Sequence, residues 1–151
     1  MFWWIEEGAL AGCHNPGDPE LSGLIASGFA TVVSLLEEDS QPPGYGPSHF
    51  SHGGCVRVSI PIPDFGFPSE GQATSFLEAV REGLGRGMVL VHCQGGSGRT
   101  GTMGALWLVE SAGLDPAEAI REVRRRNPAA VETPGQEAFL KGRSRSGHVM
   151  P

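Results

Sequence analysis

The sequence of 151 residues lacks the features that mark membrane, secreted and disulfide-stapled proteins. No apolar run approaches the roughly 18 residues that a membrane-spanning helix needs, so no membrane partner is expected. The first residues, 1–5, carry no basic side chain and run into Glu6 and Glu7, which is unlike a secretory signal. The three cysteines are too widely spaced to suggest a disulfide framework. Together these absences predict a cytoplasmic protein.

Basic charge is also scarce. Lysine and arginine number 11 against 17 aspartates and glutamates, the formal net charge is −6, and Lys141 is the only lysine. This balance argues against a nucleic-acid partner, which would require a basic surface. His14, His49 and His52 fit no common metal-ligand spacing, so neither a metal ion nor a cofactor is expected.

The length suits one hydrophobic core rather than two, and no internal repeat divides the chain. We therefore expect a single domain over residues 1–141, a disordered tail over residues 142–151, and a monomer. Glycine (23 residues) and proline (12 residues) are frequent and concentrate in the expected loops. The longest such loop, residues 37–54, indicates no function.

Strand and helix patterns alternate along the chain. Strands are expected over residues 3–5, 10–11, 31–35, 56–60 and 88–92. Helices are expected over residues 19–27, 69–85, 100–112, 116–126 and 134–141. Asp115 followed by Pro116, with Glu118 three residues after Asp115, is a clear helix start. This alternation predicts an α/β fold with a central, mostly parallel sheet flanked by helices.

The most informative segment follows the last expected strand and reads His92-Cys93-Gln94-Gly95-Gly96-Ser97-Gly98-Arg99-Thr100. Its three glycines allow a loop whose backbone N–H groups converge as a nest for an anion. The helix that follows adds unpaired N–H groups and the positive end of its dipole. Arg99 brings a planar guanidinium that fits two phosphate oxygens, and this cationic setting favours the thiolate form of Cys93. The segment predicts an anion site with a nucleophile at its floor.

A known family carries the same spacing. His92-Cys93, five intervening residues and Arg99-Thr100 match the H-C-x5-R-[S/T] signature of the cysteine-dependent protein phosphatases. From about residue 4 to residue 140 the chain resembles the small atypical dual-specificity and protein-tyrosine phosphatases of that superfamily. The resemblance implies a protein-tyrosine-phosphatase-like fold and a catalytic domain that hydrolyses phosphate monoesters.

The resemblance also assigns roles within the motif. It implies that Cys93 becomes a phosphocysteine, that Arg99 clamps the phosphoryl oxygens, and that Thr100 stabilises the leaving thiolate. His92 would orient the loop by hydrogen bonding. The residues that bind the substrate phosphate would be Gln94, Gly95, Gly96, Ser97, Gly98 and Arg99.

A candidate general acid lies upstream of this motif. Phosphoryl transfer to sulfur requires a proton for the leaving oxygen. Asp64 is the one carboxylate in residues 60–68, where an expected strand ends in a loop stiffened by prolines. The segment resembles the Ile-Pro-Asp acid loop of the small dual-specificity phosphatases. The alternative is an aspartate that only starts a turn, but no other carboxylate has a comparable setting.

A third segment, residues 131–137, resembles the Glu-Thr-x-x-Gln-Glu segment that lies beside the catalytic loop in these phosphatases. The resemblance implies that Gln136 positions the water that hydrolyses the phosphocysteine and that Glu132 braces the loop. The same residues also fit an ordinary helix start, with Thr133 as N-cap and Gln136 three residues later. The two interpretations are compatible, and both stay open.

The loop interior bears on the substrate. No lysine or histidine stands between Cys93 and Arg99, so the loop balances about one phosphate dianion. This favours phosphotyrosine, or another aryl or protein monophosphate including phosphoserine and phosphothreonine, over inositol phosphates and RNA triphosphates. Two alternatives are a rhodanese-like sulfurtransferase, which needs no acid such as Asp64, and a non-catalytic phosphate-binding module, which needs no thiol.

Two further groups have simpler interpretations. Cys13 and Cys55 are expected to be buried core residues rather than thiols that resolve an oxidised Cys93. Four arginines, at positions 121 and 124–126, end an expected helix. They are expected to complement the helix dipole and to form the pairs Glu118–Arg121 and Glu122–Arg126, rather than to dock acidic phosphoproteins.

Overall fold

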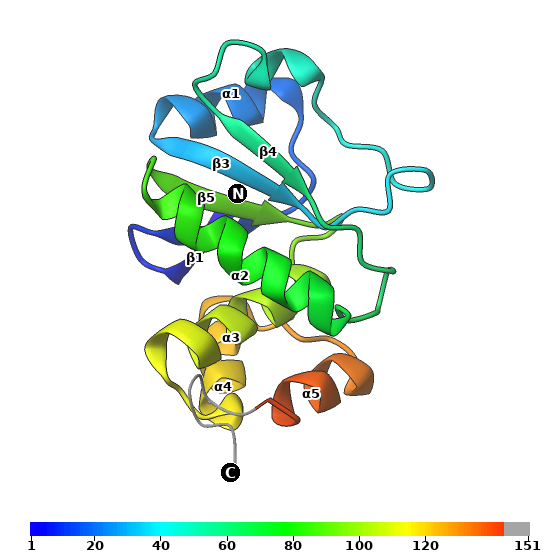
Figure 1. Ribbon diagram of the computed structural model, residues 1–151. Helices are drawn as coiled ribbons and strands as arrows, with labels where there is room; N and C mark the ends of the chain where they lie inside the picture. The colour runs from blue at the N-terminus through cyan, green and yellow to red at the C-terminus, as the bar shows by residue number, and fades with distance from the viewer. Residues whose placement is uncertain (144–151) are drawn as a thin grey trace.

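The computed structural model describes residues 1–143 and shows one sheet with helices packed on both of its faces (Figure 1). The strands are β1 (Phe2–Glu6), β2 (Leu10–Cys13), β3 (Phe29–Ser34), β4 (Val56–Ser59) and β5 (Met88–His92). The helices are α1 (Asp18–Ala26), α2 (Glu70–Leu84), α3 (Gly98–Ala112), α4 (Pro116–Arg126) and α5 (Pro134–Lys141). Every expected element is present, with bounds that differ by a few residues. The short 3-10 helix Pro47–Phe50, within the loop after β3, was not expected.

The sheet has the strand order β1-β2-β5-β3-β4. β1 pairs with β2 in antiparallel orientation, while β2–β5, β5–β3 and β3–β4 are parallel pairs. The prediction of a mostly parallel central sheet is therefore confirmed. Because the carboxyl ends of parallel strands meet at one edge, the loop that follows the central strand β5 opens at that edge between its neighbours.

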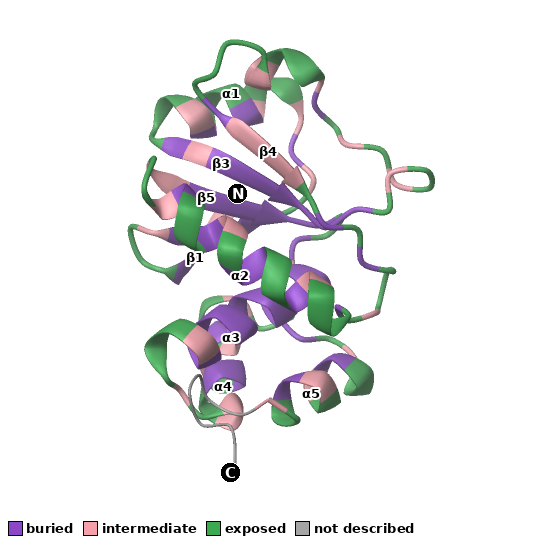
Figure 2. Cartoon of the chain, viewed as in Figure 1, coloured by how far each residue is buried: buried purple, intermediate pink, exposed green. Residues whose placement is uncertain are grey.

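The core has two parts, one on each face of the sheet. Successive side chains of a strand point to opposite faces. In β5, Val89 and Val91 join the larger core under α2, α3, α4 and α5, while Leu90 joins the smaller core under α1. β3 and β5 are buried along most of their length (Figure 2). This burial on both faces gives the segment after β5 a rigid base.

The start of α4 follows the sequence pattern, but one expected ion pair does not. Asp115 caps the helix, and the Glu118 side chain accepts from the Asp115 N–H at 3.3 Å, completing a capping box. The expected Glu118–Arg121 pair is therefore wrong, because the cap takes the carboxylate. The expected Glu122–Arg126 pair is present at 3.7 Å.

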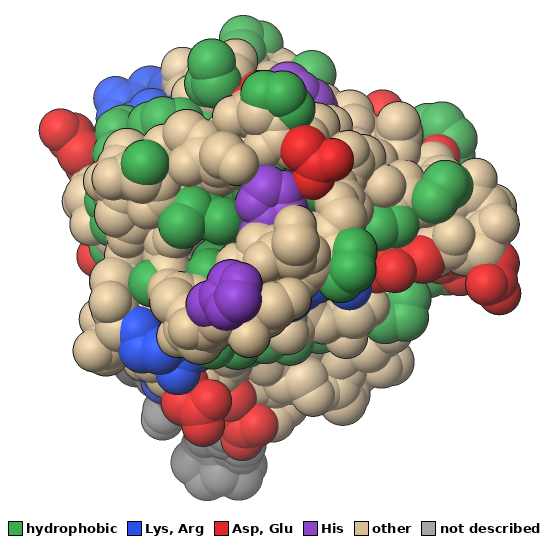
Figure 3. Space-filling model, turned by 90° about the horizontal axis from the view of Figure 1, so that it is seen from above, with side chains coloured by type: hydrophobic (Ala, Val, Ile, Leu, Met, Phe, Trp, Pro, Cys, Tyr) green, Lys and Arg blue, Asp and Glu red, His purple; other side chains and the backbone are tan. Residues whose placement is uncertain are grey.

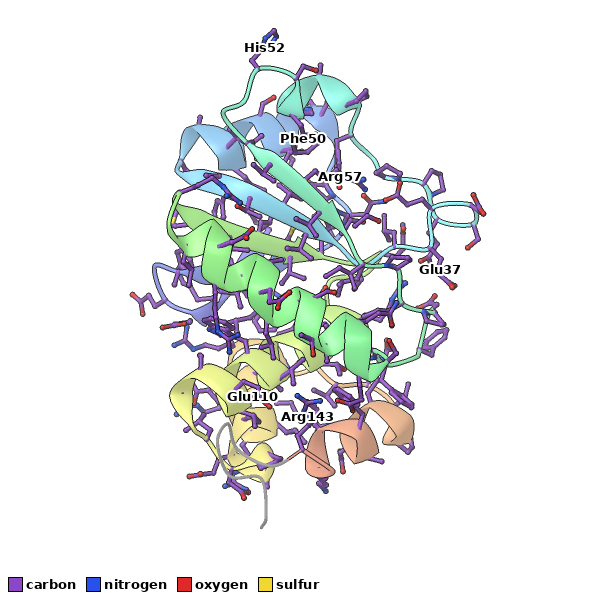
Figure 4. The ribbon with its side chains drawn as sticks, in the orientation of Figure 1. Glu37, Phe50, His52, Arg57, Glu110 and Arg143 are labelled. Atoms are coloured by element: carbon purple, nitrogen blue, oxygen red, sulfur yellow. The ribbon has the colours of Figure 1, made fainter. Side chains whose placement is uncertain are left out.

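The last described residues are held against the domain. Arg143 lies between α2 and α3, where its guanidinium donates to Glu110 at 3.0 Å and to Glu70 (Figure 4). The expected disordered tail thus begins, at residues 142 and 143, with residues that have defined contacts. Residues 144–151 of that tail lie outside the described part of the chain.

Acidic side chains outnumber basic ones in the sequence, 17 to 11. On the face seen in Figure 3, acidic side chains lie at several separate places and the basic ones form no continuous patch. Within residues 1–143, no helix has the length and hydropathy that crossing a membrane would require.

Candidate active site

Cys93 lies directly after β5, at the carboxyl edge of the sheet, and is buried. Its Sγ accepts a hydrogen bond from the Gly96 N–H at 3.2 Å and one from the Thr100 hydroxyl at 3.0 Å. Both donors favour a negatively charged sulfur over a neutral thiol. The structure therefore brings Thr100 onto the sulfur atom that the sequence singled out as nucleophile.

The loop around Cys93 is shaped by Gly96. This residue has φ +82°, and a Cβ there would lie 2.5 Å from the backbone nitrogen of His14, so only glycine fits. The Gly96 carbonyl is held from outside the loop by the Trp3 indole at 3.0 Å and the Asn127 amide at 3.3 Å. The Gly96 N–H, on the other side of the residue, points at the Cys93 sulfur. α3 then begins at Gly98 and brings its unpaired N–H groups to the same loop.

Arg99 is 2% exposed, and its guanidinium contacts protein acceptors at both terminal nitrogens. Nη1 donates to the Ile62 carbonyl at 3.0 Å and more weakly to the Leu35 carbonyl at 3.5 Å. Nη2 donates to Gln41 Oε1 at 2.9 Å and lies 3.3 Å from Asp64 Oδ1. The arginine of the motif therefore meets the candidate acid, although 35 residues of sequence separate the two.

Asp64 is 45% exposed and lies on the loop after β4. Its Oδ1 accepts from the Phe65 N–H at 3.0 Å, and its Oδ2 accepts from Gln41 Nε2 at 3.1 Å. Phe65 has φ +64°, a conformation that a bulky residue rarely adopts and that is frequent at functional sites. The loop thus presents a carboxylate beside Arg99 that stays accessible to a ligand.

Gln136 is fully buried, and both ends of its amide are bonded. Oε1 accepts from the N–H groups of Glu132 at 2.8 Å and Thr133 at 3.1 Å, and Nε2 donates to the Gly66 carbonyl at 3.0 Å. The helix-cap interpretation is confirmed, since Thr133 also accepts from the Gln136 N–H. Gln136 therefore ties α5 to the loop that carries Asp64, while its role toward water stays a prediction.

Glu132 lies beside the catalytic loop, as expected. Its carboxyl group occupies the space into which a Cβ at Gly98 would project. The first turn of α3 can therefore approach the segment before α5 only because residue 98 has no side chain. This contact braces the end of the loop at the point where the helix begins.

His92 begins a buried chain of hydrogen bonds. Its Nδ1 lies 3.2 Å from the Cys93 carbonyl and its Nε2 lies 2.8 Å from the Tyr45 hydroxyl. Tyr45 in turn accepts from Nε of Arg57, which is labelled in Figure 4, at 2.9 Å, and Arg57 pairs with Glu38 of the loop after β3. Burial, reinforced by the Arg57 charge, lowers the pKa of His92 to about 4, so the imidazole is neutral at physiological pH.

The neutral state fixes the direction of this chain. A carbonyl only accepts, so Nδ1 of His92 carries the proton and donates to Cys93. Nε2 is then an acceptor for the Tyr45 hydroxyl, whose oxygen accepts from Arg57. Every hydrogen bond from Arg57 to Cys93 therefore points its positive end toward the catalytic loop. This agrees with the expected orienting role of His92.

Within residues 1–143, no group of three histidine, cysteine, aspartate or glutamate side chains is arranged to hold a metal ion. The groups that meet at the site are a thiol, a guanidinium, a hydroxyl and a carboxylate.

A family model of the DSP-PTPase phosphatase domain of Swiss Army Knife proteins, PTP-SAK, matches residues 1–140. The chain belongs to this phosphatase family. Among solved structures it is similar to Tk-PTP in the active form, with 39% identity, a TM-score of 0.79, and coverage of 94% of this chain and 97% of that one. Kinase-associated phosphatase shares the fold, with 20% identity, a TM-score of 0.79, and coverage of 93% and 91%.

Several curated relatives of this phosphatase domain are much longer proteins. Tyrosine-protein phosphatase cdc-14 of Caenorhabditis elegans is 34% identical over 112 residues, which is 74% of this chain and 15% of the relative. Protein tyrosine phosphatase domain-containing protein 1 of Mus musculus is 32% identical over 107 residues, which is 71% of this chain and 14% of the relative. The chain therefore spans only a small part of either relative.

Sequence reasoning missed two residues of this phosphatase site. Gln41 and Tyr45 both come from the loop over residues 37–54, whose role the sequence did not indicate. Tyr45 carried a signal, because it is the only tyrosine of the chain and stands in a polar, glycine-rich segment. In the structure it is 6% exposed, which explains the aromatic residue there. Gln41 carried no such signal.

Proposed function

We propose that this chain hydrolyses phosphotyrosine, and other aryl or protein monophosphates, through a phosphocysteine intermediate on Cys93. The observation that carries this proposal is the meeting of three groups at one edge of the sheet. A sulfur atom accepts two hydrogen bonds, an arginine follows it at the start of a helix, and an accessible carboxylate lies 3.3 Å from that arginine. These are a nucleophile, a phosphate clamp and an acid.

In the first step the Cys93 thiolate attacks phosphorus, and the S–P bond forms as the bond to the leaving oxygen breaks. Arg99 and the N–H groups of the loop balance the charge on the three phosphoryl oxygens. Protonated Asp64 gives its proton to the leaving oxygen and is left as a carboxylate.

In the second step water attacks the phosphocysteine. The Asp64 carboxylate takes the proton of that water, and the S–P bond breaks to release inorganic phosphate. The Thr100 hydroxyl, which already donates to Sγ at 3.0 Å, stabilises the departing thiolate. The enzyme returns to its starting protonation state with one phosphate monoester hydrolysed.

The surroundings of Asp64 support an aryl substrate. Phe65 and Phe67 follow Asp64 on the same loop and are 62% and 48% exposed. Aromatic faces beside the acid can contact the ring of phosphotyrosine. Phosphoserine and phosphothreonine, which lack a ring, would gain less from these contacts. Sulfur transfer and simple phosphate binding are not favoured, because neither requires a general acid at the position of Asp64.

The test is turnover on a substrate panel with a matched pair of cysteine variants. The purified chain is assayed on phosphotyrosine, phosphoserine and phosphothreonine peptides, phosphoinositides and RNA 5′-triphosphate, with phosphotyrosine expected to give the highest kcat/KM. Cys93→Ser should lower kcat by more than about 1000-fold, because the serine hydroxyl is not ionised. Cys55→Ser, at another buried cysteine, should retain normal turnover.

Acid quenching during turnover of a radiolabelled phosphotyrosine peptide should trap phosphate on the wild-type protein and none on Cys93→Ser. Substantial activity in Cys93→Ser, or a phosphoinositide or RNA triphosphate preferred over phosphotyrosine, would contradict the proposal.

A further inference from the structure

Gln41 joins the two charged groups of the site through a single amide. Its Oε1 accepts from Arg99 Nη2 at 2.9 Å, and its Nε2 donates to Asp64 Oδ2 at 3.1 Å. The orientation of the amide is fixed, because a guanidinium has donors only and a carboxylate accepts. A glutamine is therefore matched to both partners at once.

The backbone that carries Gln41 is itself anchored. The Gln41 N–H donates to the Glu37 carbonyl at 2.9 Å. The Asn15 side chain, from the segment after β2, donates to the Pro42 carbonyl at 3.0 Å and accepts from the Gly44 N–H at 2.9 Å. Gln41 therefore reaches the site from a loop fixed on both sides of it.

The two partners do not depend on Gln41 equally. Arg99 is 2% exposed and keeps the Ile62 carbonyl, at 3.0 Å, as an acceptor without Gln41. Asp64 is 45% exposed, and within residues 1–143 its Oδ2 accepts a hydrogen bond from Gln41 alone. An exposed carboxylate with one oxygen unheld can rotate away from the site. Loss of Gln41 should therefore act on the acid rather than on the phosphate clamp.

A bound phosphate is compatible with this contact. Arg99 Nη2 carries two protons in the plane of the guanidinium, of which one is donated to Gln41, while Asp64 Oδ1 lies 3.3 Å from Nη2 as an ion-pair contact. The second Nη2 proton is therefore available to a phosphoryl oxygen while the first stays on Gln41. The bridge can therefore persist through the reaction.

We propose that Gln41 is a positioning residue for proton transfer: its amide holds the Asp64 carboxyl group beside Arg99, in the orientation from which it serves the leaving oxygen. This inference rests on the proposed phosphatase function. The acid matters most for leaving groups that are poor, so the effect of Gln41 should follow the leaving group.

The experiment compares kcat/KM for phenyl phosphate, a poor leaving group, with that for difluoromethylumbelliferyl phosphate, an activated one. Gln41→Met keeps the bulk of the side chain and removes both hydrogen bonds. It should lower kcat/KM about 10-fold for the poor leaving group and less than about 2-fold for the activated one. Ser48→Ala, an exposed position of the same loop, is the control and should change neither.

Two further variants identify the contact responsible. Gln41→Glu keeps an acceptor for Arg99 but cannot donate to Asp64, so it should show the same leaving-group dependence as Gln41→Met. In an Asp64→Asn background, Gln41→Met should cause less than about 2-fold additional loss, because residues that act as a unit are not additive. For Gln41→Met, the inhibition constant of inorganic phosphate should stay within about 2-fold of the wild-type value, since Arg99 keeps the Ile62 carbonyl as an acceptor.

Turnover of the activated substrate by the wild type tests the phosphatase function separately from the role of Gln41, because its absence would refute the phosphatase function itself. With an active wild type, an equal loss on both substrates, no loss on either, wild-type behaviour of Gln41→Glu, or a further loss in the Asp64→Asn background would each overturn the role of Gln41.

Discussion

Acid should destabilise this protein through one buried histidine. His92 is fully buried, and burial lowers its pKa to about 4 from the ordinary value of 6.5. Between these two values the unfolded chain binds a proton that the folded chain excludes. The stability due to neutral His92 is therefore complete above pH 6.5 and is lost as the pH falls toward 4. The difference corresponds to at most about 3 kcal/mol, of which about 2 kcal/mol is lost between pH 8 and pH 5.

The assay is urea unfolding of the wild type and of His92→Gln at pH 5, 6, 7 and 8. Glutamine is neutral at every pH and retains a donor and an acceptor. Other titrating groups, such as Asp18 with its lowered pKa, are common to both proteins and cancel in the difference. Between pH 8 and pH 5 the wild type should lose about 2 kcal/mol more of its free energy of unfolding than the variant loses.

Parallel stability curves for the two proteins would refute this reasoning. They would mean that folded His92 takes up a proton at no cost, which is incompatible with an Nε2 that accepts from Tyr45. An NMR titration of the His92 ring in the wild type provides a second measurement without any substitution. A midpoint near 4 agrees with the buried neutral imidazole, and a midpoint near 6.5 contradicts it.

Three other outcomes are expected. Arg99→Lys should lower kcat/KM for a phosphotyrosine peptide by at least about 100-fold, because an ammonium cannot make the two-pronged contact; near-normal activity would contradict the clamp. Gly96→Ala should destabilise the protein by about 1–3 kcal/mol in thermal unfolding, because its φ of +82° and the nearby backbone leave no room for a Cβ, whereas Gly95→Ala, with open space around it, should not. Peroxide should inactivate the enzyme by oxidising Cys93, and added thiols should restore activity only slowly. Burial raises the pKa of the Cys13 thiol to about 12, so Cys13 is a poor partner for a disulfide that would protect Cys93. Rapid rescue that disappears in Cys13→Ser would contradict this.

The fold and the meeting of Cys93, Arg99 and Thr100 could be predicted because their signals are local. Strand β5, the glycine loop and helix α3 follow one another without interruption, so their residues meet whatever the rest of the chain does. The motif therefore predicted that Cys93, Arg99 and Thr100 lie together. Asp64 needed only a second local signal, a rigid loop with one carboxylate.

The partners that come from distant segments could not be predicted in the same way. Gln41 and Tyr45 lie in a loop without periodicity, and their contacts depend on where the sheet places Arg99 and His92. The same limit applies to Arg143, whose acidic partners belong to two different helices. The error at Glu118 has another cause, because two local contacts competed for one carboxylate and the backbone N–H prevailed.

Gln41 and Tyr45 stand four residues apart in one loop, yet one contacts the acid and the other contacts His92 beneath the nucleophile. The number of residues between them must therefore match the distance between these two contacts. Adding or deleting a residue within it should break at least one contact, whereas changes beyond it, toward the 3-10 helix at residues 47–50, should leave both intact. We therefore expect this loop to vary in length after residue 45 and not between residues 41 and 45.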